Sequence, residues 1–170
     1  RRDDVFRAAL KKTQWECGSP TPPLPLLLRR LGALIACAPK VGTHMSGSAM
    51  DISVQDRDTG EEVDRGGPYP EISERTPMGS PFVSEIARRH REEITALMRR
   101  HGFVTYPWEF WHYNAGDAYE AVLLNTGQPA RYGAVHLHLA DGSVTPIAEP
   151  NALLNEPGEI RALMERVLRE

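Results

Sequence analysis

The chain has 170 residues, of which 41% are hydrophobic, and this length suits one compact core better than two. Its 20 basic and 23 acidic residues are mixed along the sequence and give a formal net charge of -3, which argues against a nucleic-acid-binding surface. The best apolar run, residues 24–39, is interrupted by proline, arginine and glycine, so the sequence contains no membrane span.

The N-terminal part of the sequence predicts two helices separated by a loop. Apolar residues recur at helical spacing over residues 3–16, and two aspartates at the start of this stretch suit the first turn of a helix. Residues 18–25 contain four prolines and therefore form a loop. Residues 26–36 predict a second, short apolar helix that ends before Pro39.

The central part of the sequence predicts a hairpin followed by a long loop. Residues 49–55 alternate like a half-buried strand, residues 58–60 form a turn, and residues 61–63 are the returning strand. Residues 66–81 are rich in glycine, proline and serine. Loops of this length are usually kept for a function, so we expect this loop near the functional site.

The remaining elements complete an α+β fold. Residues 84–100 predict an amphipathic helix that ends at Gly102, with four buried residues: Ile86, Ile94, Leu97 and Met98. Further strands are expected at residues 103–106, 111–113 and 134–139, with a closing helix at 159–169. We therefore expect a single α+β domain over residues 1–170, in which a small antiparallel sheet is flanked by helices.

The first segment with possible chemistry is residues 43–51. His44 and Asp51 are separated by small residues, and Gly47 and Ser48 allow the chain to fold back so that both side chains could bind one metal ion. A His and an Asp at such a spacing also occur by chance. An ordinary loop histidine is therefore the alternative interpretation of His44.

The second segment is residues 106–113, where Glu109 and His112 lie among five aromatic residues. Aromatic walls exclude water and lower the local dielectric, so Glu109 would keep its proton more easily and could serve as a base near neutral pH. The alternative interpretation is an aromatic core strand with Glu109 and His112 at its solvent-facing edge.

Together the two segments contain the residues of a catalytic zinc site. His44, Asp51 and His112 supply three ligands, which leaves the fourth tetrahedral position open for water, whereas structural sites usually close with four Cys or His ligands. Zinc lowers the pKa of bound water from 15.7 to roughly 7, and Glu109 can take the proton as the water attacks a carbonyl. The sequence therefore predicts metal-assisted hydrolysis with one zinc ion per chain.

The same pattern is similar to a known family. His44-x-x-Gly47-x-Ala49-x-Asp51 followed by Glu109-x-x-His112 resembles the zinc signature of the D-alanyl-D-alanine dipeptidases and their D,D-carboxypeptidase relatives. Three further segments agree with the family in order and approximate place: residues 78–82, 101–103 and 116–117. The resemblance covers residues 42–133. It implies that His44, Asp51 and His112 bind the zinc and that Glu109 is the general base.

The resemblance also suggests residues that contact the substrate. The family uses an arginine to stabilise the oxyanion, and this arginine falls on Arg1, for which a mobile surface charge is the alternative. It implies that an N-terminal part of the family domain precedes Arg1. Free-dipeptide enzymes have an acid where this chain has Val83, so Glu71, Glu74 or Glu85 is expected to bind the substrate amino group instead. Otherwise the substrate is a longer peptide.

Three functions remain open from the sequence. The leading hypothesis is zinc-dependent hydrolysis of the D-alanyl-D-alanine dipeptide by metal-activated water. The alternatives are a D,D-carboxypeptidase that trims peptidoglycan stem peptides and a catalytically silent zinc-binding module, which would not need Glu109 as a base. The expected partner is a small D-amino-acid peptide. The sequence leaves open the oligomeric state and the choice between cytoplasm and export.

Overall fold

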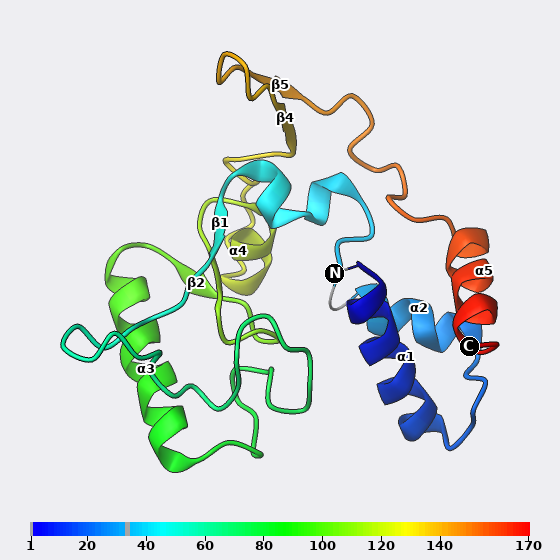
Figure 1. Ribbon diagram of the computed structural model, residues 1–170. Coiled ribbons are helices and arrows are strands. Elements are labelled where there is room, and N and C mark those ends of the chain that lie inside the picture. The colour runs from blue at the N-terminus through cyan, green and yellow to red at the C-terminus, as the bar shows by residue number, and fades with distance from the viewer. Residues whose placement is uncertain (1, 33–34) are drawn as a thin grey trace. The chain divides into compact units, whose positions relative to one another are not determined.

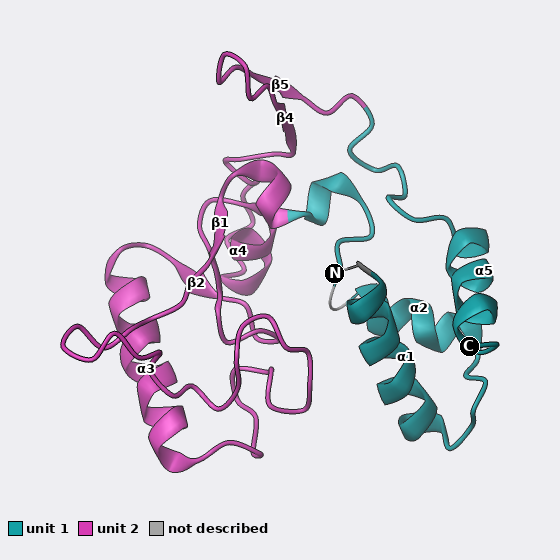
Figure 2. Ribbon diagram, in the orientation of Figure 1, with its two compact units in different colours: residues 1–42, 149–170 teal, residues 43–148 magenta. Residues whose placement is uncertain are grey.

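The computed structural model describes residues 2–32 and 35–170, and the chain divides into two compact units (Figures 1 and 2). Unit 1 comprises residues 1–42 and 149–170, and unit 2 comprises residues 43–148. Helices and small antiparallel sheets together confirm the predicted α+β class. The expected single domain stays a prediction, and each unit is described by itself. Within the described residues, no helix has the length and apolar character that crossing a membrane requires.

Unit 1 is helical. Its three α-helices are α1 (Arg2–Cys17), α2 (Leu24–Gly32) and α5 (Pro157–Val167), and a short 3-10 helix, η1 (Pro39–Val41), follows α2. The core between the α-helices is apolar and consists of Phe6, Ala9, Leu10, Leu27, Leu31 and Met164. These helices confirm the predictions at 3–16, 26–36 and 159–169 within one to four residues, except that residues 33 and 34 lie outside the described part of the chain.

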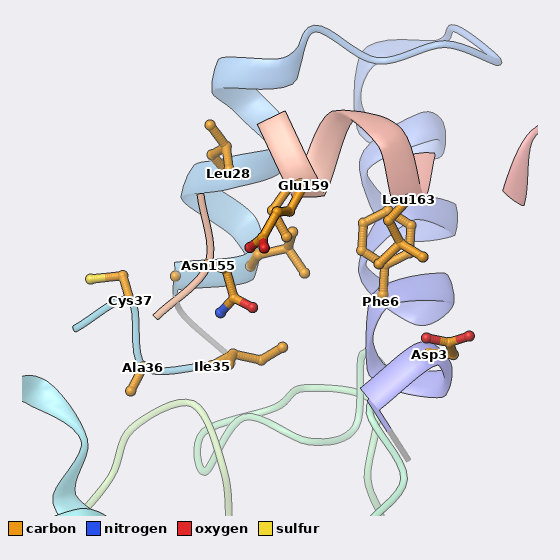
Figure 3. Close-up of a pocket in the computed structure, with 12 residues that line it drawn as sticks. Asp3, Phe6, Leu28, Ile35, Ala36, Cys37, Asn155, Glu159 and Leu163 are labelled. Atoms are coloured by element: carbon orange, nitrogen blue, oxygen red, sulfur yellow. The ribbon is translucent and has the colours of Figure 1, made fainter. Parts of the chain in front are cut away.

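A cavity of about 290 Å³ lies beside this core (Figure 3). All of its lining residues belong to unit 1, and most are apolar, such as Phe6, Leu28 and Leu163. Two carboxyl groups, those of Asp3 and Glu159, also border it. Both already have partners, since Asp3 accepts a hydrogen bond from Arg166 and Glu159 accepts one from the backbone N–H of Glu156. The cavity contains none of the site residues predicted from the sequence.

Unit 2 contains the three-stranded sheet that positions the candidate site. Its strands are β1 (Ala49–Asp51), β2 (Val104–Thr105) and β3 (His112–Asn114), in the order β1-β3-β2 with antiparallel pairing. The register sets Asp51 opposite His112. Directly opposite residues in an antiparallel pair point to the same face of the sheet, so these two side chains lie next to each other. The predicted small antiparallel sheet is confirmed, although strands β1 and β2 are shorter than expected.

The long helix of unit 2, α3 (Glu85–Arg100), confirms the helix predicted at 84–100, and its N-cap is Ser84, whose hydroxyl accepts a hydrogen bond from Ala87 N–H. The prediction that Ile86 and Leu97 are buried is wrong, because these side chains are 60% and 44% exposed. Ile94 is buried as predicted, Met98 is half-buried, and the other buried residues of the helix are Ala87, Arg91 and Thr95. Arg91 occupies the interior because its guanidinium donates hydrogen bonds to loop carbonyls. With Arg91 on the buried face of the helix, Ile86 and Leu97 lie on the solvent-facing side.

The other elements of unit 2 are short. The predicted hairpin is present as a backbone pairing, with a bridge between Gln55 and Glu62. The strand predicted at 134–139 is β4 (Val135–Leu137), which pairs with β5 (Val144–Pro146). Helix α4 (Ala118–Leu123) and the 3-10 helix η2 (Thr43–Ser46) were not predicted from the sequence. The apolar pattern of these segments is too short to indicate a helix.

Candidate functional site

Three short elements of unit 2 bring His44, Asp51 and His112 together. His44 lies in η2, Asp51 is the last residue of β1, and His112 is the first residue of β3. The chain reverses between η2 and β1 at Gly47, whose φ of 67° lies in the left-handed region that favours glycine. The fold-back expected from the small residues before Asp51 is therefore present.

The polar atoms of these three side chains converge on one point. Asp51 Oδ1 lies 3.3 Å from His44 Nε2 and 3.1 Å from His112 Nδ1. One possible ligand atom from each residue lies within 4.8 Å of the others, and in the described part of the chain this is the group of His and acidic residues that could hold a metal ion. The His44 side chain is 54% exposed and that of His112 is 7% exposed, so the site opens to solvent on the His44 side.

Charge pairing shifts the pKa values of two of these groups. Burial raises the pKa of Asp51, but the hydrogen bonds from His112 and His44 and the charges of these imidazoles together outweigh it and hold that pKa well below its usual range. The hydrogen bond to Asp51 raises the pKa of His44, an effect that burial opposes. In the absence of a metal, Asp51 is therefore a carboxylate that attracts a cation to this point.

Glu109 lies beside the three residues and is only 13% exposed. Its Oε2 is 3.8 Å from His112 Nδ1. Burial, with a smaller contribution from the Asp51 charge, raises the pKa of Glu109 to about 7, while His44 and a hydrogen bond from Trp111 oppose the shift. A carboxyl group with this pKa can accept and release a proton near neutral pH.

The aromatic residues around Glu109 are only partly an enclosing wall. Phe110, Trp111 and Tyr113 are buried, but Trp108 is half-exposed. The Tyr106 ring lies 5.1 Å from the His112 ring, and Phe110 packs on two buried guanidinium groups rather than on the site. The five aromatic residues therefore do not form one wall around Glu109, and the sequence alone could not show which of them are buried.

Two hydroxyl groups that sequence reasoning missed contact the site. Thr43 Oγ1 lies 3.1 Å from His112 Nε2, and Tyr69 donates a hydrogen bond of 3.2 Å to Asp51 Oδ2. A hydroxyl can donate or accept, so Thr43 can pair with His112 in either tautomer. The available signals were the position of Thr43 next to His44 and a tyrosine within the proline-rich loop.

A buried carboxylate connects the turn that carries His44 to strand β3. Asp117, which caps helix α4, accepts hydrogen bonds from Ser48 Oγ at 2.9 Å and from Asn114 Nδ2 at 2.7 Å. Ser48 in turn contacts Ser46 at 2.6 Å within the same turn. Asp117 thereby fixes η2 relative to the sheet, which is a positioning role for a residue that the sequence comparison with the family singled out.

In the part of the chain that the structure describes, Glu71 and Glu74 make no hydrogen bond or ion pair with the three side chains. Glu71 and Glu74 are exposed, and among the described residues only their backbone carbonyls accept hydrogen bonds, from Thr76 and Ser80. Val83 is buried against Gly66, where any side chain at position 66 would overlap Val83. Arg1 lies outside the described residues.

Comparison with known proteins gives consistent matches over this part of the sequence. The family described as D-ala-D-ala dipeptidase matches residues 33–131, which is more than half of the chain. A D-alanyl-D-alanine dipeptidase of Synechocystis is 33% identical over an alignment of 108 residues, which covers 54% of this chain and 43% of that protein.

Two further relatives carry the same name. The D-alanyl-D-alanine dipeptidase of Escherichia coli is 33% identical over 81 residues, or 48% of this chain and 42% of that protein. The one from Enterococcus faecium is 32% identical over 75 residues, or 44% of this chain and 37% of that protein. The matched region therefore spans less than half of the length of these relatives.

Proposed function

The chain belongs to the D-Ala-D-Ala dipeptidase family, and from this membership we propose that it is a zinc-dependent hydrolase of D-alanyl-D-alanine. In this proposal His44, Asp51 and His112 hold the metal and Glu109 is the general base. The observation that carries it is the convergence of three ligand atoms within 4.8 Å of one another, beside a buried carboxyl group.

The three residues fit a zinc ion in chemistry and in spacing. Two imidazoles and one carboxylate are ligands that zinc accepts, and three protein ligands are typical of catalytic sites. Ligand atoms about 2.0–2.2 Å from one ion in tetrahedral directions lie roughly 3.3–3.5 Å apart. The separations of 3.1 and 3.3 Å from Asp51 Oδ1 to the two imidazoles are close to this spacing, and all three ligand atoms lie within 4.8 Å of one another.

The proposed reaction divides between the metal and Glu109. Bound zinc would supply a Lewis acid that polarises the substrate carbonyl and lowers the pKa of water to about 7. Glu109 takes the proton from the attacking water at its carboxylate and delivers it to the leaving amino group. A pKa of about 7 supports this role, since both protonation states of Glu109 are then populated near neutral pH.

The substrate part of the proposal rests on the relatives, which are named D-alanyl-D-alanine dipeptidases. We propose Glu71 and Glu74 as candidates for binding the substrate's amino group. Both belong to the loop that carries Tyr69, whose hydroxyl contacts Asp51. Replacing Glu71 or Glu74 by Gln should raise KM for the free dipeptide and leave KM for an N-acylated peptide unchanged. Preference of the wild type for the N-acylated peptide would favour a D,D-carboxypeptidase instead.

We propose Arg1 as the residue that stabilises the oxyanion, and this role rests only on the resemblance to the family. The test is to replace Arg1 by Lys and by Ala and compare kcat. A fall in kcat at unchanged KM for Ala, with partial recovery for Lys, is expected from a charge that acts on the transition state.

A metal assay combined with product release tests the central proposal. The wild type is expected to bind one zinc ion and to release D-alanine from D-alanyl-D-alanine. Asp51→Ala is expected to lose both zinc and activity. Full zinc occupancy in Asp51→Ala would contradict the ligand set, and a wild type that binds zinc without hydrolysing either substrate would point to a zinc-binding module.

A further inference from the structure

The loop of residues 65–78 is held at both ends by one side chain of α3. Arg91 is buried, and its guanidinium donates four hydrogen bonds of 2.7–3.2 Å to backbone carbonyls of the loop. The accepting carbonyls belong to Arg65, Arg75, Pro77 and Met78. These acceptors lie at the beginning and the end of the loop, so Arg91 holds the two ends of the loop together.

The same loop is attached to the segment that leads into β3. Phe110 N–H donates to Thr76 O at 3.1 Å, and Met78 N–H donates to Pro107 O at 3.0 Å. The Phe110 ring also lies 4.3 Å from the centre of the Arg91 guanidinium. The loop is therefore fixed with respect to the segment that carries Glu109 and His112.

Tyr69 projects from this fixed loop onto Asp51. Its hydroxyl donates to Asp51 Oδ2 at 3.2 Å, and its ring meets the Trp111 ring edge to face at 5.5 Å. The two oxygens of Asp51 thus have different partners. Oδ1 faces both imidazoles, and Oδ2 faces the Tyr69 hydroxyl.

We propose that Tyr69 is a positioning residue that presents Asp51 Oδ1 alone to the metal, and that Arg91 acts through Tyr69 by holding the loop. A carboxylate without such a partner can rotate and offer either oxygen or both, which loosens the geometry of the site. Hydrogen-bonding partners of metal ligands commonly strengthen metal binding in this way. The inference rests on the proposed function in that it takes Asp51 as a ligand.

Zinc affinity of Tyr69→Phe tests the first step. This variant removes one hydroxyl and keeps the ring contact with Trp111, so the fold should be preserved. We expect its zinc dissociation constant, measured by competition with a chromophoric chelator, to rise by roughly 10–100-fold. Tyr132→Phe is the matched control, because it removes the hydroxyl of an exposed tyrosine just outside the matched residues 33–131, and its affinity should equal that of the wild type.

The spectrum of the cobalt(II)-loaded protein gives a second measurement. Visible absorption of cobalt(II) weakens when its coordination number rises above four. If Tyr69 restricts Asp51 to one oxygen, the Tyr69→Phe spectrum should be weaker than that of the wild type. Unchanged zinc affinity together with an unchanged cobalt spectrum in Tyr69→Phe would overturn the inference.

A double-mutant cycle tests whether Arg91 acts through Tyr69. Arg91→Lys keeps the charge but cannot reach four carbonyls, so the loop should loosen and zinc affinity should fall. In the Tyr69→Phe background, Arg91→Lys should change zinc affinity little further. Additive effects would show that Arg91 acts by another route. If Arg91→Lys does not fold, Arg91→Gln, which can still reach part of the carbonyl set, replaces it in the cycle.

The outcomes separate this inference from the proposed function. A wild type that does not bind zinc contradicts the proposed function. A wild type that binds zinc, with Tyr69→Phe unchanged in both zinc affinity and cobalt spectrum, contradicts only the role of Tyr69.

Discussion

The two units differ in the polarity of the side chains that they bury. Unit 1 buries an apolar set from three helices, and in the described part of this unit its buried polar side chain is Thr13, whose hydroxyl donates to a carbonyl of its own helix. Unit 2 instead buries several polar and charged residues: Arg65, Arg91, His112, Asn114 and Asp117. Apolar burial stabilises a fold without specifying single atomic positions, whereas buried polar groups must be hydrogen-bonded in definite directions.

The difference explains why the candidate site lies in unit 2. Hydrogen bonds that Asp117 accepts, and others that Arg91 and Tyr69 donate, fix the segments that carry the site residues. A proposed metal centre needs its ligands within a few tenths of an ångström of the required positions. The polar interior of unit 2 supplies this directional constraint, and the apolar core of unit 1 does not.

The largest expected effect is the loss of hydrolysis in Glu109→Gln. The amide cannot accept the proton from water, so kcat should fall by roughly 10²–10⁴-fold, the range typical of a general base. Zinc occupancy should remain that of the wild type, because Glu109 is not among the proposed ligands. The measurement is D-alanine release at saturating zinc, with the metal content of both proteins determined in parallel. Hydrolysis at the wild-type rate in this variant would contradict the role of Glu109 as general base.

A substitution in the apolar core of unit 1 should affect stability and leave the site intact. Leu27 is fully buried, and Leu27→Ala is expected to lower the free energy of unfolding by roughly 2–5 kcal/mol. Leu139→Ala is the matched control, because Leu139 is 88% exposed and its truncation should change stability by at most about 0.5 kcal/mol. Urea unfolding measures both.

The zinc affinity of Leu27→Ala decides whether the comparison holds. If the site depends only on the polar interior of unit 2, the folded variant should bind zinc as tightly as the wild type. A large loss of affinity in this variant, with none in Leu139→Ala, would show that the apolar core also shapes the site.

The sequence predicted the apolar framework better than the polar interior. The helices of unit 1 and α3 follow from periodic apolar residues, and the motif around His44 and Asp51 singled out side chains that the fold brings together. Arg91 was missed because a charged residue on a helix normally faces solvent. Its burial depends on carbonyls 13 to 26 residues away, which no local pattern records.

Contacts between distant residues account for the other omissions. Tyr69 lies 18 residues from Asp51, and Ser48 lies 69 residues from Asp117, so neither hydrogen bond has a signature in the spacing of residue types. Ile86 and Leu97 were wrongly placed in the interior for a related reason. The spacing of apolar residues predicts one buried face of α3. The face that is buried contains Arg91, because the loop carbonyls accept hydrogen bonds from its guanidinium.

The raised pKa of Glu109 predicts a pH-dependent stability in the metal-free protein. A pKa of about 7 in the folded state, above the ordinary value of 4.5, stabilises the fold below pH 4.5, and this contribution is lost as the pH rises through 7. Glu109→Gln does not titrate. In chelator, the variant should therefore gain up to roughly 3 kcal/mol of stability relative to the wild type between pH 4.5 and pH 8.

Urea unfolding of both proteins at the two pH values measures this gain. The titration of Asp51 is shared by both proteins and largely cancels in the difference, whereas the pKa of His44 is lower in the variant because the Glu109 charge no longer raises it. A constant difference between wild type and variant across this range would mean that Glu109 is not desolvated as the fold indicates.

The smallest expected effect comes from Asp117→Asn in the polar network of unit 2. Asparagine can still accept the hydrogen bonds of the α4 N-cap, but it replaces a charged acceptor of Ser48 by an amide, which should cost about 1 kcal/mol of unfolding free energy. Asp141→Asn is the matched control, since exposed Asp141 accepts only a turn hydrogen bond. Because Ser48 holds the turn that carries His44, Asp117→Asn should weaken zinc binding several-fold while Asp141→Asn should not. A stability loss as large as that of Leu27→Ala, without any change in zinc affinity, would mean that the polar interior of unit 2 stabilises the fold rather than positioning the site.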